Sequence, residues 1–226
     1  MSRLIVWAGG AIFVASLALC AWWYLVPLGV AAPGVRASAL AFNAVIFTVF
    51  AAHHSLFARD ALKTAVARVV PDHLLRSVYV WIASLLLILV VASWRPVGGE
   101  LYRATGWAAL LLAAAQLAGL GLIAGAVRTI DPLELAGIRR GATATQDALQ
   151  VAGPYRWVRH PLYLGWVIAV FGSPHMTGDR LAFAVITTIY LVAAVPWEER
   201  ALTRSFGDQY RRYQRDVRWR IVPYVY

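Results

Sequence analysis

Residues 153–165 read GPYRWVRHPLYLG, and this stretch decides how the last third of the chain folds. Pro161 suits the first position of a helix, because proline lacks the amide hydrogen that would be unsatisfied there. His160 is then the predicted cap residue of that helix. The apolar run 162–171 follows, and a Gly-Ser-Pro turn separates it from a second apolar run, 181–195. The stretch therefore predicts the start of a helical hairpin.

Four longer apolar runs precede the hairpin. The 226-residue chain is 61% hydrophobic and 14% charged, whereas soluble domains carry about 25% charged residues. Each run is long enough to cross a hydrocarbon core of roughly 30 Å as a helix; the runs are residues 4–26, 37–57, 74–91 and 107–127. We therefore expect an all-α integral membrane protein with four transmembrane helices, a C-terminal helical hairpin and a cytoplasmic tail helix.

Positive charge is unevenly distributed among the segments that flank the runs. Of the 21 Lys and Arg residues, 17 fall in segments 1–3, 58–76, 128–160 and 198–226. By the positive-inside rule, both termini are expected to be cytoplasmic. The net charge of +10 is split among these flanks rather than gathered on one module, so membrane lipid, and not nucleic acid, is the expected partner.

Polar side chains gather where the hairpin begins. Tyr163 follows His160 by three positions, so both side chains fall on one face of the helix. The free amides at a helix N-terminus favour an anionic group, and Arg156 and Arg159 would reinforce that preference. The alternative is that the two arginines only anchor a span at the lipid headgroups.

Glu198 and Glu199 follow the second run of the hairpin, where a carboxylate must be hydrated, paired or ligand-bound. Carboxylates bind sugar hydroxyls, and a bound cation gains from nearby aromatic rings; the rings available are Trp197, Tyr210 and Tyr213. One glutamate is therefore expected to face a ligand. The alternative is a solvated helix start, with both glutamates paired to arginines of the tail.

Three other features indicate packing rather than chemistry. Gly119, Gly121 and Gly125 superficially resemble a dinucleotide fingerprint, but they lie inside an apolar run, so close helix packing through Gly121 and Gly125 is expected. Cys20 is the only cysteine, lies inside the first run and is expected to pack there. The five histidines lack the spacing of a metal site, so no metal is expected.

Residues 153–165 and the tail segment 198–213 together resemble the cofactor-binding C-terminal half of the isoprenylcysteine carboxyl methyltransferase family. Members of this family are integral membrane enzymes that use S-adenosylmethionine. The resemblance implies cofactor contacts from His160, Tyr163 and Glu198 or Glu199, and an acceptor contact from Arg204.

The resemblance also divides the chain by role. Residues 1–127 form the expected four-helix transmembrane region, and residues 128–226 form the expected cofactor site from a cytoplasmic loop, the hairpin and the tail. Arg159 joins the implied cofactor-binding residues, since its charge would hold the carboxylate of the methionine part of the cofactor.

Upstream features are similar to the methanethiol S-methyltransferase branch of this family; they are His54-Ser55 with Arg59, and residues 76–80, 94–96 and 134–139. The similarity implies methylation of a small thiol such as methanethiol to a thioether. A thiol acceptor needs a base nearby, and His54, near the end of the second run, is expected to accept the thiol proton. The adjacent His53 points about 100° away on a helix, so the two histidines form no ligand pair.

Several alternatives stay open. The acceptor alternatives are a prenylated cysteine carboxylate, a phospholipid amine or another lipophilic compound. Membrane sterol reductases, which use NADPH, share the Arg-His-Pro element of residues 159–161, but their pattern continues with Asn-Tyr, whereas Leu-Tyr follows here. A transporter would carry ionisable residues near the bilayer middle, where only Asn43 and Gln116 are polar. The oligomeric state is not predicted.

Overall fold

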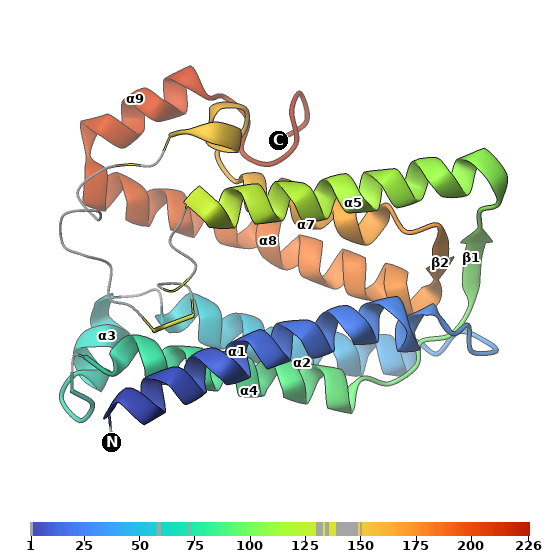
Figure 1. Cartoon of the computed structure of the whole chain (residues 1–226), viewed down its shortest axis with the longest axis horizontal. Coiled ribbons are helices and arrows are strands. Elements are labelled where there is room, and N and C mark those ends of the chain that lie inside the picture. Colours follow the sequence, from blue (N-terminus) through green and yellow to red (C-terminus); the bar gives the residue numbers. More distant parts are fainter. Residues whose placement is uncertain are drawn as a thin grey trace. The chain divides into compact units, whose positions relative to one another are not determined.

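The computed structural model describes residues 2–57, 60–71, 73–129, 133, 136–138, 149 and 151–226 (Figure 1). The helices are α1 (Ser2–Leu25), α2 (Ala37–Phe57), α3 (Asp60–Val66), α4 (Leu75–Ser93), α5 (Gly106–Thr129), α7 (Pro161–Phe171), α8 (Gly178–Phe206) and α9 (Asp208–Asp216). Two short 3-10 helices, η1 (Pro27–Gly29) and η2 (Gly153–Arg156), accompany them. The strands β1 (Glu100–Arg103) and β2 (His175–Thr177) pair in a small sheet that the sequence did not predict.

Within the described residues, five helical segments are long and apolar enough to cross a membrane: Arg3–Gly29, Ala37–Phe57, Leu75–Ser93, Gly106–Thr129 and Gly178–Phe206. The first four coincide with the runs predicted before the hairpin. The fifth is α8, the second arm of the hairpin, which is longer than the predicted run 181–195 because the helix continues through Pro196. The first arm, α7, begins at Pro161 as predicted. The chain is thus an all-α membrane protein.

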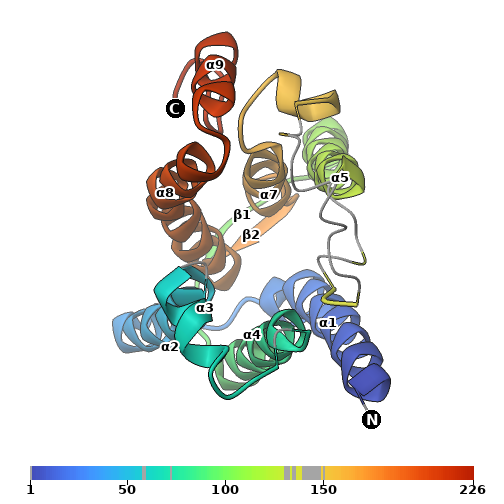
Figure 2. The same cartoon turned by 90° about the vertical axis from the view of Figure 1, so that its left-hand side faces the viewer.

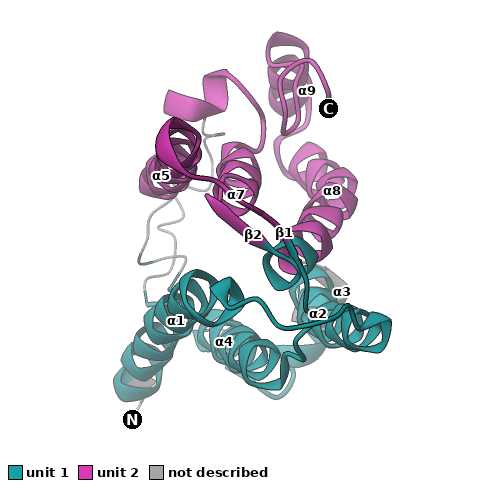
Figure 3. Ribbon diagram, turned by 90° about the vertical axis from the view of Figure 1, so that its right-hand side faces the viewer, with its two compact units in different colours: residues 1–100, 132–140, 177–182 teal, residues 101–131, 141–176, 183–226 magenta. Residues whose placement is uncertain are grey.

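The chain divides into two compact units (Figure 3). Unit 1 comprises Met1–Glu100, Pro132–Arg140 and Thr177–Ala182, and unit 2 comprises Leu101–Asp131, Gly141–Met176 and Phe183–Tyr226. These units are defined by packing. The predicted division into a transmembrane region, 1–127, and a cofactor-site region, 128–226, is defined by function, and it stays a prediction.

In unit 1, α4 packs against both α1 and α2. The Trp81 indole of α4 donates a hydrogen bond to the Ile5 carbonyl of α1 at 3.0 Å. Gly9 makes room for this indole, since a Cβ there would lie 2.8 Å from its Nε1. Asn43 of α2 exchanges two hydrogen bonds with the backbone of Arg95, at 2.8 and 2.9 Å. The Trp81 indole and the Asn43 amide thus find protein partners within these apolar helices, as a bilayer favours.

Two buried charges anchor the start of α8 in unit 1. Asp179 accepts hydrogen bonds from the Trp94 indole and from two backbone amides of the α4–β1 connection, at 2.8, 2.9 and 3.1 Å. Arg180 donates to two carbonyls at the end of α1, at 3.1 and 2.6 Å. Burying a charge without partners is costly, so these bonds explain why an adjacent Asp and Arg are both buried here.

In unit 2, α7 lies between α5 and α8 (Figures 2 and 3). The contact with α5 is close at Gly119, where a Cβ would lie 2.6 Å from the Gly165 carbonyl oxygen. On the opposite side, the Trp166 indole of α7 donates to the Thr187 hydroxyl of α8 at 2.9 Å. The hairpin is thus held from both sides.

The packing predicted for Gly121 and Gly125 requires correction. A Cβ on Gly121 would meet no atom of the described residues within 4 Å, and one on Gly125 would meet only Pro154 Cγ, at 4.0 Å. Gly121 follows Gly119 by two positions, which is about 200° around a helix, so it faces away from α7. The close helix contact therefore belongs to Gly119.

Candidate active site

Three of the predicted site residues meet where α7 begins. The rings of His160 and Tyr163 stack with centroids 5.3 Å apart and planes 12° apart. The Tyr163 hydroxyl donates a hydrogen bond to Glu198 of α8. His160 Nδ1 lies 3.4 Å from the other carboxylate oxygen of Glu198. We call these three side chains the His160 cluster.

Glu199 has different partners from Glu198. Its carboxylate lies 2.6 Å from Arg159 Nε, 3.3 Å from Arg220 Nε and 3.4 Å from Gln214 Nε2. The side chain of Glu199 is 6% exposed, whereas that of Glu198 is 42% exposed. Glu199 is therefore held by the protein, while Glu198 is accessible to a ligand.

The two glutamates lie within α8, which runs to Phe206. They do not start a new helix, so the alternative of a solvated helix start is wrong. The other part, pairing with arginines of the tail, holds for Glu199 and Arg220. Gln214 and Arg220 were not singled out from the sequence, because contacts between the tail and α8 follow no periodic pattern. The sequence offered one signal for them: a carboxylate in an apolar helix needs a cationic partner.

Burial and negative charge act in opposite directions on His160. Burial lowers the pKa of His160, but its interactions with Glu198 and Glu199 prevail and raise the pKa above its ordinary value of 6.5. Nε2 lies 3.6 Å from Glu199 Oε1 and has no hydrogen-bond partner among the described residues. Burial, and then the charge of Glu198, raise the pKa of Tyr155 to about 12, so this phenol stays neutral and can donate a hydrogen bond.

The tail pairs with the residues that precede α7. The amides of Arg159 and His160 donate to the carbonyls of Trp219 and Arg220, at 2.9 and 2.8 Å. The Arg159 guanidinium also donates to two tail carbonyls, at 2.7 Å each. These two amides and the Arg159 guanidinium thus have protein partners here, and binding of a cofactor carboxylate by Arg159 stays a prediction.

The remaining predicted residues differ in their surroundings, and Tyr210 and Tyr213 lie close enough to Glu199 and Arg159 for these charges to act on them. Trp197 is exposed, with the Arg200 guanidinium 4.4 Å from its ring centroid. Tyr210 and Tyr213 are buried and pack with Val217. Arg204 is exposed in the last turn of α8.

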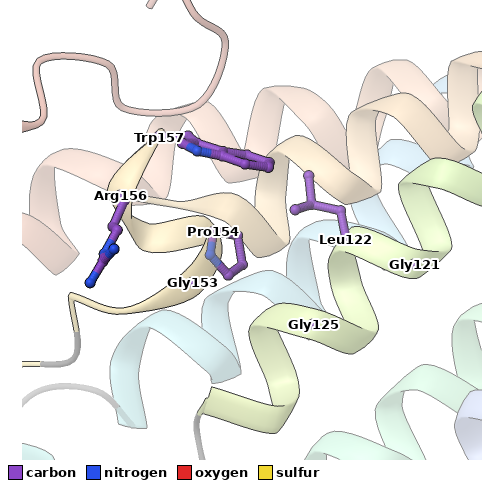
Figure 4. Close-up of a pocket in the computed structure, with 7 residues that line it drawn as sticks. All are labelled: Gly121, Leu122, Gly125, Gly153, Pro154, Arg156 and Trp157. Atoms are coloured by element: carbon purple, nitrogen blue, oxygen red, sulfur yellow. The ribbon is translucent and has the colours of Figure 1, made fainter.

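An apolar groove of about 470 Å³ lies between α5 and η2 (Figure 4), lined by Gly121, Leu122, Gly125, Gly153, Pro154, Arg156 and Trp157. The missing side chains of Gly121 and Gly125 leave its α5 wall open. Tyr163 and Gly165 are about 200° apart on α7, so the His160 cluster and the contact with α5 occupy opposite faces of that helix. Arg156 lines this groove and no part of the His160 cluster.

His54 belongs to unit 1, near the end of α2, and its ring contacts Tyr79 of α4. Arg59, Glu134 and Arg139, which shared in the upstream similarity, lie outside the described residues. In the described part of the chain, no group of three or more His, Cys, Asp or Glu side chains is arranged to hold a metal ion.

Comparison with known proteins identifies the family. The phospholipid methyltransferase family model matches residues 108–209. Methanethiol S-methyltransferase 2 of Bradyrhizobium diazoefficiens is 34% identical over 202 residues, which cover 86% of this chain and 78% of that protein. The chain belongs to the methanethiol S-methyltransferase family. The family's protein from Mycobacterium tuberculosis is 36% identical over 192 residues, which cover 79% of this chain and 76% of that protein.

This membership confirms the resemblance to membrane methyltransferases that the sequence motifs indicated. Protein-S-isoprenylcysteine O-methyltransferase A of Arabidopsis thaliana is 37% identical over 68 residues, which cover 29% of this chain and 34% of that protein. No solved structure matches the chain. As a member of the methanethiol S-methyltransferase family with five apolar helical segments in its described part, the protein is an integral membrane methyltransferase. The methyltransferase names favour methyl transfer over the reductase alternative.

Proposed function

We propose that this enzyme transfers a methyl group from S-adenosylmethionine to a small thiol, methanethiol or a close analogue, to give a thioether. Two relatives whose names state that activity support the acceptor, at 34% and 36% identity over most of the chain. The observation that carries the cofactor assignment is the partly exposed Glu198 carboxylate beside His160 and Tyr163.

The side chains of the His160 cluster suit this cofactor, which when bound supplies a methyl group on a cationic sulfonium. Glu198 can accept hydrogen bonds from ribose hydroxyls, and its negative charge favours a nearby cation. The face of the Tyr163 ring also favours a cation. The buried Nε2 of His160, which lacks a partner among the described residues, is a polar atom that a ligand can satisfy. We therefore assign cofactor binding to Glu198, His160 and Tyr163.

The other site residues receive supporting roles in this proposal. Arg159 and Glu199 hold the start of α7 against α8 and the tail, through the buried ion pair between them. Arg204 lies near the acceptor, on the strength of the family resemblance alone. His54 accepts the proton of the thiol, which leaves the sulfur as a thiolate able to take the methyl group.

The proposal includes a position in the membrane. The chain crosses a bacterial inner membrane through α1, α2, α4 and α5, the α7–α8 hairpin opens at the cytoplasmic face, and α9 belongs to a cytoplasmic tail. Four of the five apolar helical segments and the distribution of the basic residues support this topology, in which α8, the fifth segment, belongs to the hairpin. Membrane lipid then surrounds the apolar helices.

Purified protein in detergent, given methyl-labelled S-adenosylmethionine, tests the reaction. The acceptor panel is methanethiol, a prenylcysteine and phosphatidylethanolamine, and we expect label in the methanethiol thioether. A labelled prenylcysteine ester or lipid amine without any thioether would overturn the acceptor assignment. Calorimetric titration with S-adenosylhomocysteine tests the cofactor separately, and binding of NADPH with no response to the nucleoside would overturn that assignment.

A further inference from the structure

The groove between α5 and η2 in unit 2 combines an apolar wall with a cation. Figure 4 shows the Trp157 ring extending toward Leu122 of α5, while the Arg156 side chain extends the opposite way. Of the seven lining residues, Arg156 is the one that carries a charge, and none is a carboxylate. We call this feature the α5–η2 groove.

A second cation lies on the face of α5 that borders the groove. Arg128 follows Gly121 by seven positions and Gly125 by three, so the three residues fall on one helix face. Arg128 is exposed in the last turn of α5, about 10 Å from Gly121 along the helix axis. Among the described residues, no ion pair joins Arg128 or Arg156 to an Asp or Glu side chain. Both guanidinium groups therefore have charge to offer an anion.

The other surroundings of the groove suit an acyl chain. Leu117 precedes Gly121 by one helical turn and is 67% exposed, so the apolar face of α5 continues beyond the groove. The Trp157 side chain is exposed, and tryptophan rings favour the level of the lipid headgroups. The volume of about 470 Å³ lies within the range of about 300–1,000 Å³ that is usual for ligand sites. A phospholipid supplies both an acyl chain for the apolar wall and a phosphate for the arginines.

We propose that the α5–η2 groove binds one anionic phospholipid of the cytoplasmic leaflet. An acyl chain lies along Gly121 and Gly125, and the phosphate is held by Arg156 and Arg128. A headgroup without an ammonium fits best, because the groove lining has two cations nearby and no carboxylate to receive an ammonium. Basic pockets beside cytoplasmic helix ends are typical sites for such lipids.

This lipid is a bound partner and not the methyl acceptor, since the groove contains no residue of the His160 cluster. The inference is independent of the proposed reaction. The choice of leaflet rests on the proposed topology, in which α5 ends at the cytoplasmic face.

Titration of the purified protein in a non-ionic detergent tests the headgroup preference. The two probes are dioctanoyl phosphatidylglycerol and dioctanoyl phosphatidylethanolamine, whose acyl chains are the same, so a difference between them reports the headgroup. A lipid that binds the folded protein raises the unfolding temperature by mass action, and the concentration dependence gives the affinity. We expect phosphatidylglycerol to bind about tenfold more tightly, through its charged hydrogen bonds. Inorganic phosphate should give no rise, because it lacks the acyl chain.

Three variants locate the binding. The double variant Arg128→Gln, Arg156→Gln should lower the affinity for phosphatidylglycerol about tenfold, to that for phosphatidylethanolamine. Gly121→Leu should fill the groove and weaken both lipids, and it should fold as the parent does, because a Cβ there meets no described atom within 4 Å. Arg212→Gln is the matched control, since it removes the same charge from an exposed position on α9.

Equal affinity of the parental protein for the two lipids, or an equal rise with inorganic phosphate alone, would overturn the proposal. So would a double arginine variant that keeps the parental preference. Titration of Gly121→Leu with S-adenosylhomocysteine separates this site from the cofactor site. Parental nucleoside affinity with weakened lipid binding supports the lipid site, whereas lost nucleoside affinity with parental lipid binding would assign the groove to the cofactor.

Discussion

Glu198 and Glu199 are adjacent in sequence, yet their carboxylates meet different chemistry because neighbouring residues of a helix point about 100° apart. One carboxylate contacts Tyr163 and His160 and is partly exposed. The other is buried among two arginines and a glutamine. We therefore expect Glu198, rather than Glu199, to face the proposed cofactor.

Replacing each glutamate by glutamine should produce two different phenotypes. Glu198→Gln should weaken S-adenosylhomocysteine binding about tenfold or more, through loss of a charged hydrogen bond, with little change in unfolding temperature. Glu199→Gln should cost about 3–5 kcal/mol of stability, because it leaves Arg159 buried without its ion-pair partner. Titration calorimetry and thermal unfolding in detergent separate the two effects.

The control for this pair is Asp208→Asn. The Asp208 side chain is 79% exposed, and among the described residues its ion pair is with Arg211 of the same helix, α9. It should change neither binding nor stability. The assignment fails if Glu198→Gln binds with parental affinity while Glu199→Gln loses binding at unchanged stability.

The raised pKa of His160 predicts that the stability of the protein depends on pH. Its folded pKa is raised, so the stabilisation from its charged form is fully present below about 6.5 and is lost as the pH rises through the folded pKa. The unfolding temperature of the parental protein should therefore exceed that of His160→Gln most at about pH 6, and the gap should shrink toward about pH 9. A gap that widens with pH would show that the imidazole is not charged in the folded state.

At the scale of the helix, α5 carries two glycines with opposite environments. Gly119 touches the backbone of α7, whereas Gly121 faces the groove beside η2 (Figure 4). Gly119→Ala should cost about 1–3 kcal/mol, because the added Cβ has to push backbone apart. Gly121→Ala meets open space and gains about 1 kcal/mol of helix propensity, so it should unfold at the parental temperature or above. Equal destabilisation of the two variants would contradict the packing of α5 on α7.

Hydropathy and proline chemistry sufficed to predict the long apolar helices and the start of the hairpin, but not the small sheet. The apolar runs before the hairpin and the start of α7 at Pro161 both follow from local composition. The contact of Gly119 with α7 could not be predicted from the sequence. The four-residue spacing of Gly121 and Gly125 fits any helix face that has a partner, so it does not identify the face that packs. Nor did the Arg220 contact with Glu199, since it depends on how the tail folds back on α7. Local sequence rules thus predict long helices, whereas the contacts between side chains distant in sequence depend on the tertiary fold.

At the scale of the whole molecule, the proposed topology makes opposite predictions for two exposed positions. Asp208→Cys and Arg36→Cys, each in a Cys20→Ala background, provide single labelling sites, because Cys20 is the only native cysteine. In intact spheroplasts, a membrane-impermeant maleimide should label position 36 and spare position 208. In inverted inner-membrane vesicles the pattern should reverse. Labelling of position 208 from outside would invert the orientation derived from the basic residues.

The pairing of Glu199 with the tail also sets an order of assembly during synthesis. Gln214 and Arg220 are translated after every apolar helix, so α8 leaves the ribosome before two of the partners of Glu199 exist. Arg159, which is made earlier, is the partner that can neutralise the carboxylate in that interval. We therefore expect the proposed cofactor site to be completed late, after membrane insertion and on arrival of the tail. A nascent chain stalled just past α8 would then be inserted with that site unfinished.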